Sequence, residues 1–286
     1  MKVLVTGGCG FVGSNLVDRL IELGYEVLVI DDLSAGKKKY CNSGASYIFK
    51  DFKKEMENNK DELIDVIFHL AAEARIQPSF ANPLYTCKNN SYGSAIVADF
   101  AKNSNARVVY SGSSSFYGGT YLNPYAFAKW QGEEVFKMYS KVYDVDVGIA
   151  RFFNVYGPRN PLIGQYTPVV AIFEEQKKAG KPLTIVGDGE QRRDFTHVCD
   201  ICDGLIAISK KPWRGDVFNL GTGINYSINE LAGMFGGEKQ YLPARRGEAR
   251  ITLADITKTT KMIGWTPKHN LVNYIKDFLT QTGTQK

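Results

Sequence analysis

The sequence lacks the features of a membrane-spanning or secreted protein. No apolar run approaches the roughly 18 residues that a membrane-spanning helix needs, and the opening MKVLVTGG has none of the three sections of a signal peptide. Cysteines are few and odd in number, at five in 286 residues, which favours reduced thiols over a disulfide framework. We therefore expect a cytoplasmic protein with no membrane partner.

Charge of one sign is not concentrated anywhere in the chain. The 35 basic and 30 acidic residues leave a net charge of +5, and the one run of three basic residues lies at 37–39. A nucleic-acid-binding face needs a denser basic patch. No nucleic-acid partner is therefore expected.

Metal-binding patterns are also scarce. Cys199 and Cys202 form a CxxC pair, but the segment around them has a helical pattern. No second pair or nearby histidine is recognised as completing a zinc site, so no metal site is predicted.

What the sequence does contain is a regular alternation of strand and helix patterns over roughly the first 150 residues. Strands are predicted at 2–6, 26–30, 47–49, 65–69, 107–110 and 146–151, and helices at 11–23, 83–102 and 123–142. This alternation predicts an α/β fold with a Rossmann-type, doubly wound parallel sheet covered on both faces. Ligands of such sheets bind beyond the carboxyl ends of the strands, where the strand order reverses.

The pattern becomes less regular after residue 151, where loops, shorter helices and Pro/Gly-rich segments follow one another. We predict a Rossmann domain over 1–154, to which 194–224 returns. The segments 155–193 and 225–286 are then expected to form a smaller mixed α/β C-terminal domain that binds the substrate.

A glycine-rich turn connects the first predicted strand and helix. In TGGCGFVG, Gly7, Gly10 and Gly13 are spaced by three, which suits a tight turn whose backbone approaches a pyrophosphate at a helix N-terminus. The second strand ends at Asp31 and Asp32, where a carboxylate can accept from the ribose hydroxyls of adenosine and would repel a 2′-phosphate. The pattern predicts NAD in preference to NADP; the alternative is an ordinary strand-helix turn with Asp31 as a strand cap.

Three polar side chains are predicted to meet at the carboxyl edge of the sheet. Tyr125 and Lys129 follow Pro124, which suits a first helical turn, so they share one helix face, and Ser113 follows the fifth predicted strand. A tyrosine that takes a hydroxyl proton needs its pKa lowered from ~10 toward ~7, and a lysine ammonium together with oxidised nicotinamide can do this. We predict Tyr125 as base, Lys129 as its activator and Ser113 as a partner of the reacting oxygen; the alternative for Tyr-x-x-x-Lys is a solvated helix face.

Together these motifs resemble the extended short-chain dehydrogenase/reductase family, and within it the sugar-nucleotide epimerases of the UDP-glucose 4-epimerase type. The similarity continues through FHLAAEA (68–74), PYAFAK, RFFNVYGPR (151–159), GDGEQRRDFTHV (187–198), FNLGTG (218–223) and ARRGEARITLADITKTTKMIGW (244–265). It therefore covers nearly the whole chain with specific motifs.

The resemblance implies the cofactor contacts position by position. It places Phe11 and Val12 beside the pyrophosphate, Asp51 and Phe52 beside the adenine, and Phe153 along the nicotinamide. The implied NAD contacts are Gly7, Gly10, Phe11, Val12, Gly13, Asp31, Asp32, Ser34, Gly36, Asp51, Phe52, Leu70, Ala71, Ala72, Ala74, Asn89, Tyr125, Lys129 and Phe153.

The resemblance also implies a nucleotide-sugar site. Arg193 and Arg245 are expected on the phosphates, because planar guanidinium groups match diphosphate oxygens; a register error of one would exchange them for Arg192 and Arg246. The implied substrate contacts are Ser113, Tyr125, Asn154, Arg193, Arg245, Glu248 and Thr252.

The activity implied is NAD-dependent inversion of C4 in UDP-glucose and UDP-galactose through a 4-keto intermediate. The small residue Thr252 indicates that UDP-GlcNAc and UDP-GalNAc are also accepted. Ser114, Ser115 and Phe116 stand where dehydratase relatives carry an acid pair, which favours plain epimerisation. The link from Ser113 to Tyr125 is shorter than in typical epimerases.

Two alternatives stay open at this point. One is another enzyme of the extended family, such as a UDP-glucuronate epimerase or a GDP-sugar epimerase or reductase. The other, from a different class, is a non-catalytic dinucleotide-sensing protein. By analogy, a homodimer is expected through the helices at 83–102 and 123–142.

Overall fold

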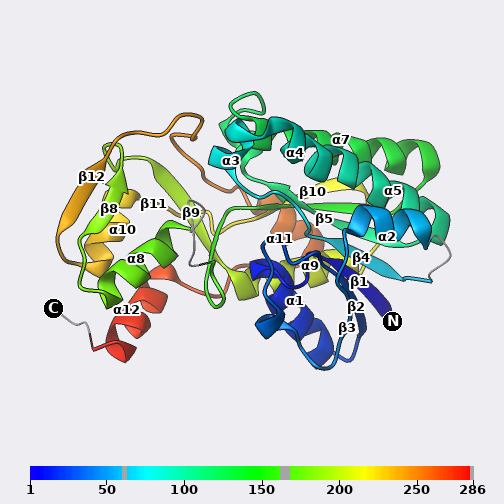
Figure 1. The fold of residues 1–286 in the computed structure, drawn as a ribbon, viewed down its shortest axis with the longest axis horizontal. Helices are drawn as coiled ribbons and strands as arrows, with labels where there is room; N and C mark the ends of the chain where they lie inside the picture. The colour runs from blue at the N-terminus through cyan, green and yellow to red at the C-terminus, as the bar shows by residue number, and fades with distance from the viewer. Residues whose placement is uncertain (60–62, 162–167, 284–286) are drawn as a thin grey trace.

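The main body of the protein is a seven-stranded parallel sheet, seen in a computed structural model that describes residues 1–59, 63–161 and 168–283 (Figure 1). Its strands are β1 (Lys2–Thr6), β2 (Glu26–Ile30), β3 (Ser46–Ile48), β4 (Val66–His69), β5 (Arg107–Ser113), β6 (Val147–Phe152) and β10 (Arg214–Leu220). Their order is β10-β6-β5-β4-β1-β2-β3, so the direction of winding reverses between β1 and β4. The predicted fold class is confirmed.

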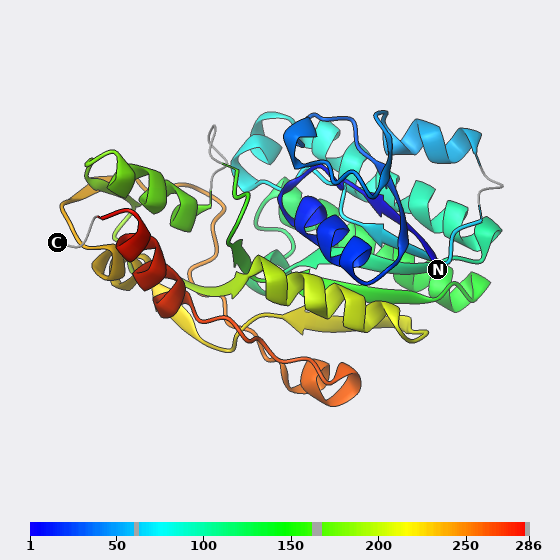
Figure 2. The same cartoon turned by 90° about the horizontal axis from the view of Figure 1, so that it is seen from below.

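Helices cover both faces of this sheet because its strand residues alternate between two cores. Val3 and Val5 belong to a core with α1 (Phe11–Glu22) and α9 (Val198–Ser209), which lie on the face seen in Figure 2. Leu4 points the other way, into a core shared with α2 (Phe52–Asn58), α5 (Gly93–Ser104) and α7 (Pro124–Tyr143).

The region predicted as one helix over 83–102 is three consecutive pieces. They are α4 (Pro83–Cys87), a π-helical turn η2 (Lys88–Tyr92) and α5. The short helix α3 (Ile76–Ala81) precedes them. Periodicity alone could not show the break, because a π turn adds a residue to one turn without introducing proline or glycine.

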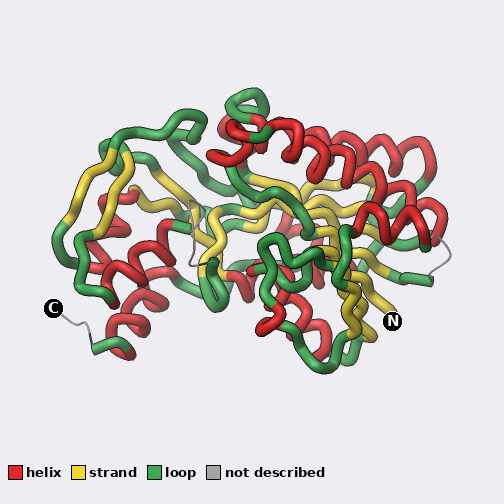
Figure 3. Tube along the Cα trace, in the orientation of Figure 1, coloured by secondary structure: helices red, strands yellow, loops and turns green. Residues whose placement is uncertain are grey.

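A smaller unit occupies the left of Figure 1, and Figure 3 shows its strands and helices joined by long loops. Its elements are a mixed sheet of β7 (Asn154–Tyr156), β9 (Arg192–His197) and β11 (Asn225–Ser227), a parallel pair β8 (Leu183–Val186) and β12 (Lys239–Leu242), and the helices α8 (Val169–Lys178), α10 (Ile228–Phe235) and α12 (Leu271–Gln281). These elements enclose a third apolar core.

The chain passes between the two units several times. After β9 it returns to the large unit as α9, and β10 then pairs with β6 at the edge of the large sheet. The segment after β12 crosses back as a loop to α11 (Thr257–Ile263), which packs on β10 (Figure 1). Among the described residues, no helix combines the length and the apolar character that crossing a membrane would require.

Candidate active site

A cavity of about 730 Å3 lies at the carboxyl ends of the central strands and extends to the smaller unit. All residues that the sequence assigned to cofactor or substrate line this cavity, with the single exception of Asp51. Residues from Gly7 to Glu248, far apart in the chain, therefore share one continuous site, as the carboxyl edge of a parallel sheet predicts.

The glycine-rich turn has the geometry of a phosphate-binding loop. Gly7 has a φ of +74°, and a Cβ there would approach the backbone nitrogen of Ala71 to 2.8 Å. A Cβ on Gly13 would collide with the carbonyl of Gly7, so only glycine lets α1 begin so close to β1. Gly10, the N-cap of α1, offers no side chain to the first amide groups of the helix. These donors suit the pyrophosphate of a dinucleotide.

Two carboxylates are fixed at the end of β2. The carboxylate of Asp31 accepts from the backbone N–H of Cys9 (2.9 Å) and of Leu33 (2.8 Å), and burial raises its pKa. Asp32 accepts from the backbone N–H of Ser34 at 2.9 Å. The two side chains line the cavity beside the glycine loop, where their acceptors suit the ribose hydroxyls of an adenosine.

The expected contact of Asp51 with the adenine is not supported by its position. Its carboxylate caps α2 through the N–H of Lys53 and forms a 2.9 Å ion pair with the ammonium of the same residue, and it does not line the cavity. Lys53 does line it, and its Nζ donates to Asn89 at 2.7 Å. Lys53 could not be predicted as a cavity residue, because a lysine in a first helical turn is usually a surface residue.

Ser113, Tyr125 and Lys129 meet as predicted. The hydroxyl of Tyr125 donates to Ser113 Oγ at 3.3 Å, and Lys129 Nζ lies 3.4 Å from Ser111 Oγ. Asn123 accepts from the N–H of Ala126 at 2.7 Å and so begins α7 one residue before Pro124. The start of the helix thus directs both side chains to the end of β5.

A buried ion pair fixes α7 against β6. Glu133 lies one turn after Lys129, and its Oε2 is 2.6 Å from Nη2 of Arg151, with both side chains almost inaccessible. The guanidinium carbon of Arg151 also lies 3.5 Å from the ring centre of Phe116, in the turn that follows Ser113. The pair therefore joins α7, β6 and the turn between β5 and α7.

Burial controls the titration of the phenol and the ammonium. It raises the pKa of Tyr125, against the hydrogen bond to Ser113, and it lowers the pKa of Lys129 to about 7, against the negative charge of Glu133. The chain alone therefore favours the neutral phenol of Tyr125, and it makes the charged form of Lys129 less stable than that of a solvated lysine.

Glu73 is a cavity residue that sequence reasoning missed. Burial raises the pKa of its carboxyl, and its negative charge contributes to the raised pKa of Tyr125. The side chain of Asn90 bonds both backbone groups of Glu73, at 2.8 and 2.9 Å. The available signal was an acid in the otherwise apolar turn HLAAEA, directly after a buried strand.

The side chains expected to bind the nucleotide also lie in the cavity wall. Arg193 pairs with Glu248 at 3.6 Å, and Asn154 Nδ2 lies 3.4 Å from Thr252 Oγ1. Burial lowers the pKa of Arg193, so an anionic partner would stabilise its charge. Arg245 lines the same wall.

The neighbouring arginines Arg192 and Arg193, and likewise Arg245 and Arg246, lie in different surroundings. Arg192 binds Asn225 at 2.9 Å and Glu230 at 3.0 Å, and Arg246 stacks on Phe80 at 4.2 Å from the ring centre. Neither of these lines the cavity, whereas Arg193 does. In the strand β9, alternate residues face opposite sides, which separates Arg192 from Arg193.

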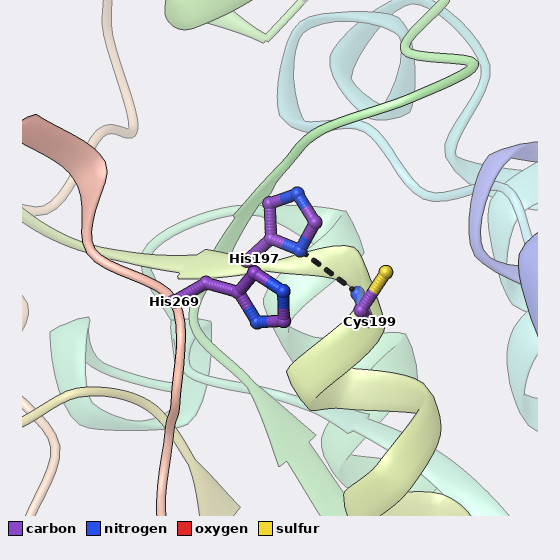
Figure 4. A group of neighbouring side chains, drawn as sticks. All are labelled: His197, Cys199 and His269. Atoms are coloured by element: carbon purple, nitrogen blue, oxygen red, sulfur yellow. Dashed lines mark hydrogen bonds between the residues drawn. The ribbon is translucent and has the colours of Figure 1, made fainter. Parts of the chain in front are cut away.

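The interpretation of the CxxC pair needs a correction. Two histidines do lie near Cys199: His197 at the end of β9 and His269 in the segment before α12, as Figure 4 shows. Cys202 is buried one turn further along α9 and is not in this group. His269 follows Cys199 by 70 residues, so only the fold brings them together.

Known proteins resemble the chain over its whole length. The model of the NAD dependent epimerase/dehydratase family matches residues 3–221. UDP-glucose 4-epimerase of Mycolicibacterium smegmatis is 34% identical over 94% of each chain. The solved UDP-glucose 4-epimerase of Thermotoga maritima, with UDP-glucose, superposes with a TM-score of 0.93 at 31% identity over 99% of each chain.

A further solved structure is similar over almost the whole chain. UDP-N-acetylglucosamine 4-epimerase of Methanobrevibacter ruminantium, in complex with UDP-N-acetylmuramic acid, has a TM-score of 0.88 and 32% identity over 98% of each chain. The family match, the full-length identity and the glycine, aspartate, tyrosine and lysine geometry agree with one another. The chain therefore belongs to the NAD dependent epimerase/dehydratase family, as an epimerase that uses NAD.

Proposed function

We propose that this epimerase inverts C4 of UDP-glucose and UDP-galactose, and that Tyr125 is the group that removes and returns the O4 proton. The observation that carries the proposal is the position of the Tyr125 hydroxyl, 3.3 Å from Ser113 Oγ, in a cavity that Arg193 and Arg245 also line. A phenol and guanidinium groups in one cavity match a sugar joined to a diphosphate.

NAD, when bound, supplies a positive nicotinamide and accepts hydride from C4. The phenol needs that charge, because burial raises the pKa of Tyr125 and brings the pKa of Lys129, the neighbouring cation, down to about 7. Each neighbouring positive charge favours the phenolate. We infer that proton removal by Tyr125 depends on the oxidised cofactor and on a protonated Lys129, while Ser113 donates to or accepts from O4.

The nucleotide is held more firmly than the sugar in this proposal. Arg193, Arg245 and Glu248 of the smaller unit, over 155–193 and 225–286, would bind the diphosphate and ribose together with Asn154 at the start of β7. Around the sugar position the wall consists of small side chains, among them Ser114 and Ser115. A weakly held sugar can present either face to the nicotinamide, which inversion requires.

The pocket also supports use of N-acetylated sugars. Thr252 lines the cavity and is buried, and its hydroxyl lies 3.4 Å from Asn154 Nδ2. A small residue at this point leaves space for an acetamido group. We therefore include UDP-GlcNAc and UDP-GalNAc among the substrates.

A product analysis tests the proposal. The protein is incubated with UDP-glucose, UDP-GlcNAc, UDP-glucuronate or GDP-mannose without added reductant, and the sugars are resolved by chromatography. C4-inverted products are expected from the first two sugars. Net consumption of a nicotinamide cofactor, or inversion of UDP-glucuronate alone, would show that the substrate assignment is wrong. Thr252→Tyr should reduce turnover of UDP-GlcNAc much more than turnover of UDP-glucose.

A cytoplasmic homodimer is the proposed assembly. The five cysteines are unpaired, which supports a reducing compartment. Leu84 on α4 is 82% exposed, and Met138 and Val142 on α7 are 44% and 59% exposed, so these helices offer apolar surface to a second copy. Sedimentation analysis tests this: a monomer at micromolar concentration would contradict it.

A further inference from the structure

Three metal-binding side chains meet outside the catalytic cavity. His197 ends β9, Cys199 is the second residue of α9, and His269 lies in the segment that leads to α12. One ligand atom from each lies within 4.8 Å of the other two, and Figure 4 shows the rings and the thiol grouped at the start of the helix. None of the three lines the cavity described above.

The His269 ring is held as metal-ligating histidines usually are. Its Nδ1 lies 2.8 Å from Oδ1 of Asp200, a carboxylate that is 1% exposed. Asp200 also accepts from the backbone N–H of Lys268 and of His269 itself, at 3.1 and 3.0 Å. A carboxylate on one ring nitrogen fixes the orientation and leaves the other, Nε2, as a ligand atom.

The remaining two ligands differ in mobility. His197 is 6% exposed, and its Nδ1 accepts from the backbone N–H of Cys199 at 3.2 Å, so its lone pair points toward the start of the helix. Cys199 is exposed, and the His269 side chain is 44% exposed. The buried ring thus provides a fixed ligand, and the two accessible side chains can approach it.

Only a modest rearrangement brings the three atoms to bonding distance. Zinc bonds of about 2.0–2.3 Å in a tetrahedral arrangement place ligand atoms roughly 3.5 Å apart. The present separations of up to 4.8 Å therefore need to shorten by about 1 Å. The rings of His197 and His269 now stack at 4.2 Å, so the His269 ring must tilt out of the stack about its hydrogen bond to Asp200, which keeps Nδ1 in place.

We propose that His197, Cys199 and His269 bind one divalent transition-metal ion of the zinc class. Two imidazoles and a thiolate are the donor set that such borderline-soft ions prefer, whereas Mg2+ and Ca2+ require oxygen ligands. The exposed side of the group leaves a fourth position for water. The ion displaces the thiol proton of Cys199 and takes the lone pair that His197 now shares with a backbone N–H.

The ion joins two parts of the fold. Cys199 belongs to the helix that packs on the large sheet, while His269 directly precedes α12, which packs in the core of the smaller unit. Binding therefore attaches the C-terminal segment to the β9–α9 junction. The site is structural, and the rate of epimerisation does not depend on it.

Cobalt titration of the full chain tests the proposal. Chelator-treated protein, kept reduced with a phosphine, is titrated with Co2+, and the thiolate-to-cobalt charge-transfer band is recorded. One equivalent is expected to produce the band, and Zn2+ is expected to remove it by displacement. Cys199→Ser should abolish the band, and Cys87→Ser, the control for another accessible thiol, should retain it.

Two histidine variants complete the test. His197→Asn keeps a good N-cap for α9 while it removes the imidazole, and His269→Gln removes the other ring. Each should weaken Co2+ binding by at least about tenfold, as loss of a ligand must cost no less than loss of its outer partner. Absence of the band in the wild type, or an unchanged affinity in either histidine variant, would show that the proposal is wrong.

Discussion

The hydroxyl of Tyr125 lies 3.3 Å from the hydroxyl of Ser113, although a helix start and a strand end hold them separately. Neither element is stabilised by this contact to any large extent. The contact matters for the reaction, because both oxygens can reach one carbinol oxygen of a bound sugar.

Tyr125→Phe removes the proton acceptor and leaves the ring. We expect the rate of epimerisation to fall by about 10²-fold or more, because general base catalysis contributes about that much, while the unfolding temperature changes little. Tyr121→Phe is the matched control, since Tyr121 is 82% exposed. Both variants are compared by initial rates with UDP-glucose. Equal rates for Tyr125→Phe and the wild type would exclude the phenol as the base.

Glu73→Gln removes a negative charge that raises the pKa of Tyr125. Without it the phenolate forms at lower pH, so the acidic limb of the kcat/KM profile should move to lower pH. The backbone of residue 73 stays bound to Asn90, which protects the fold. Glu238→Gln, on the segment before β12, should leave the profile unchanged. A shift of the limb to higher pH would contradict the electrostatic role of Glu73.

Lys129→Met should make the protein inactive but more stable. Burial lowers the pKa of Lys129 to about 7, so below that pH the folded state carries a poorly solvated ammonium that the unfolded state solvates freely. Its removal should raise the free energy of unfolding by up to about 5 kcal/mol near pH 6. As the pH rises above the folded pKa, the lysine becomes neutral in the folded state and the gain should shrink. Denaturant unfolding near pH 6 and pH 9 measures this difference.

Arg193→Ala should affect substrate binding more than chemistry. Arg193 is 3.6 Å from Glu248 in the cavity wall, and we propose it as a partner of the diphosphate, so we expect KM to rise roughly 10- to 100-fold, as for loss of a charged hydrogen bond, with a smaller change in kcat. Arg246→Ala, which stacks on Phe80 outside the cavity, is the control. A fall in kcat at constant KM would place Arg193 near the reacting atoms instead.

The parts of the site that sequence reasoning predicted are those fixed by local geometry. A tight turn between strand and helix requires Gly7 and Gly13, and a spacing of four on one helix requires Tyr125 and Lys129 to share a face. Parallel strands then bring their carboxyl ends to one edge. These relationships depend on a few neighbouring residues, so the sequence contains enough information to predict them.

The remaining parts depend on contacts between distant elements. Glu73 acts on Tyr125 only because the turn after β4 and the start of α7 line the same cavity, and His269 reaches Cys199 only because the chain crosses between units before α12. Residues 83–104 are helical throughout, as predicted over 83–102, but no sequence pattern indicated the π turn within them. No pattern of neighbouring residues in the sequence indicates these contacts or the π turn.

The ion pair of Glu133 and Arg151 has a consequence for the short connection that precedes Tyr125. Because this pair anchors α7 to β6 two turns beyond the tyrosine, the connection does not set the position of the phenol. Residues 117–122 can thus change in length or composition, reshaping the mouth of the sugar pocket while the proton-transfer groups keep their spacing. The sugar preference of this enzyme can therefore change without rebuilding its chemistry.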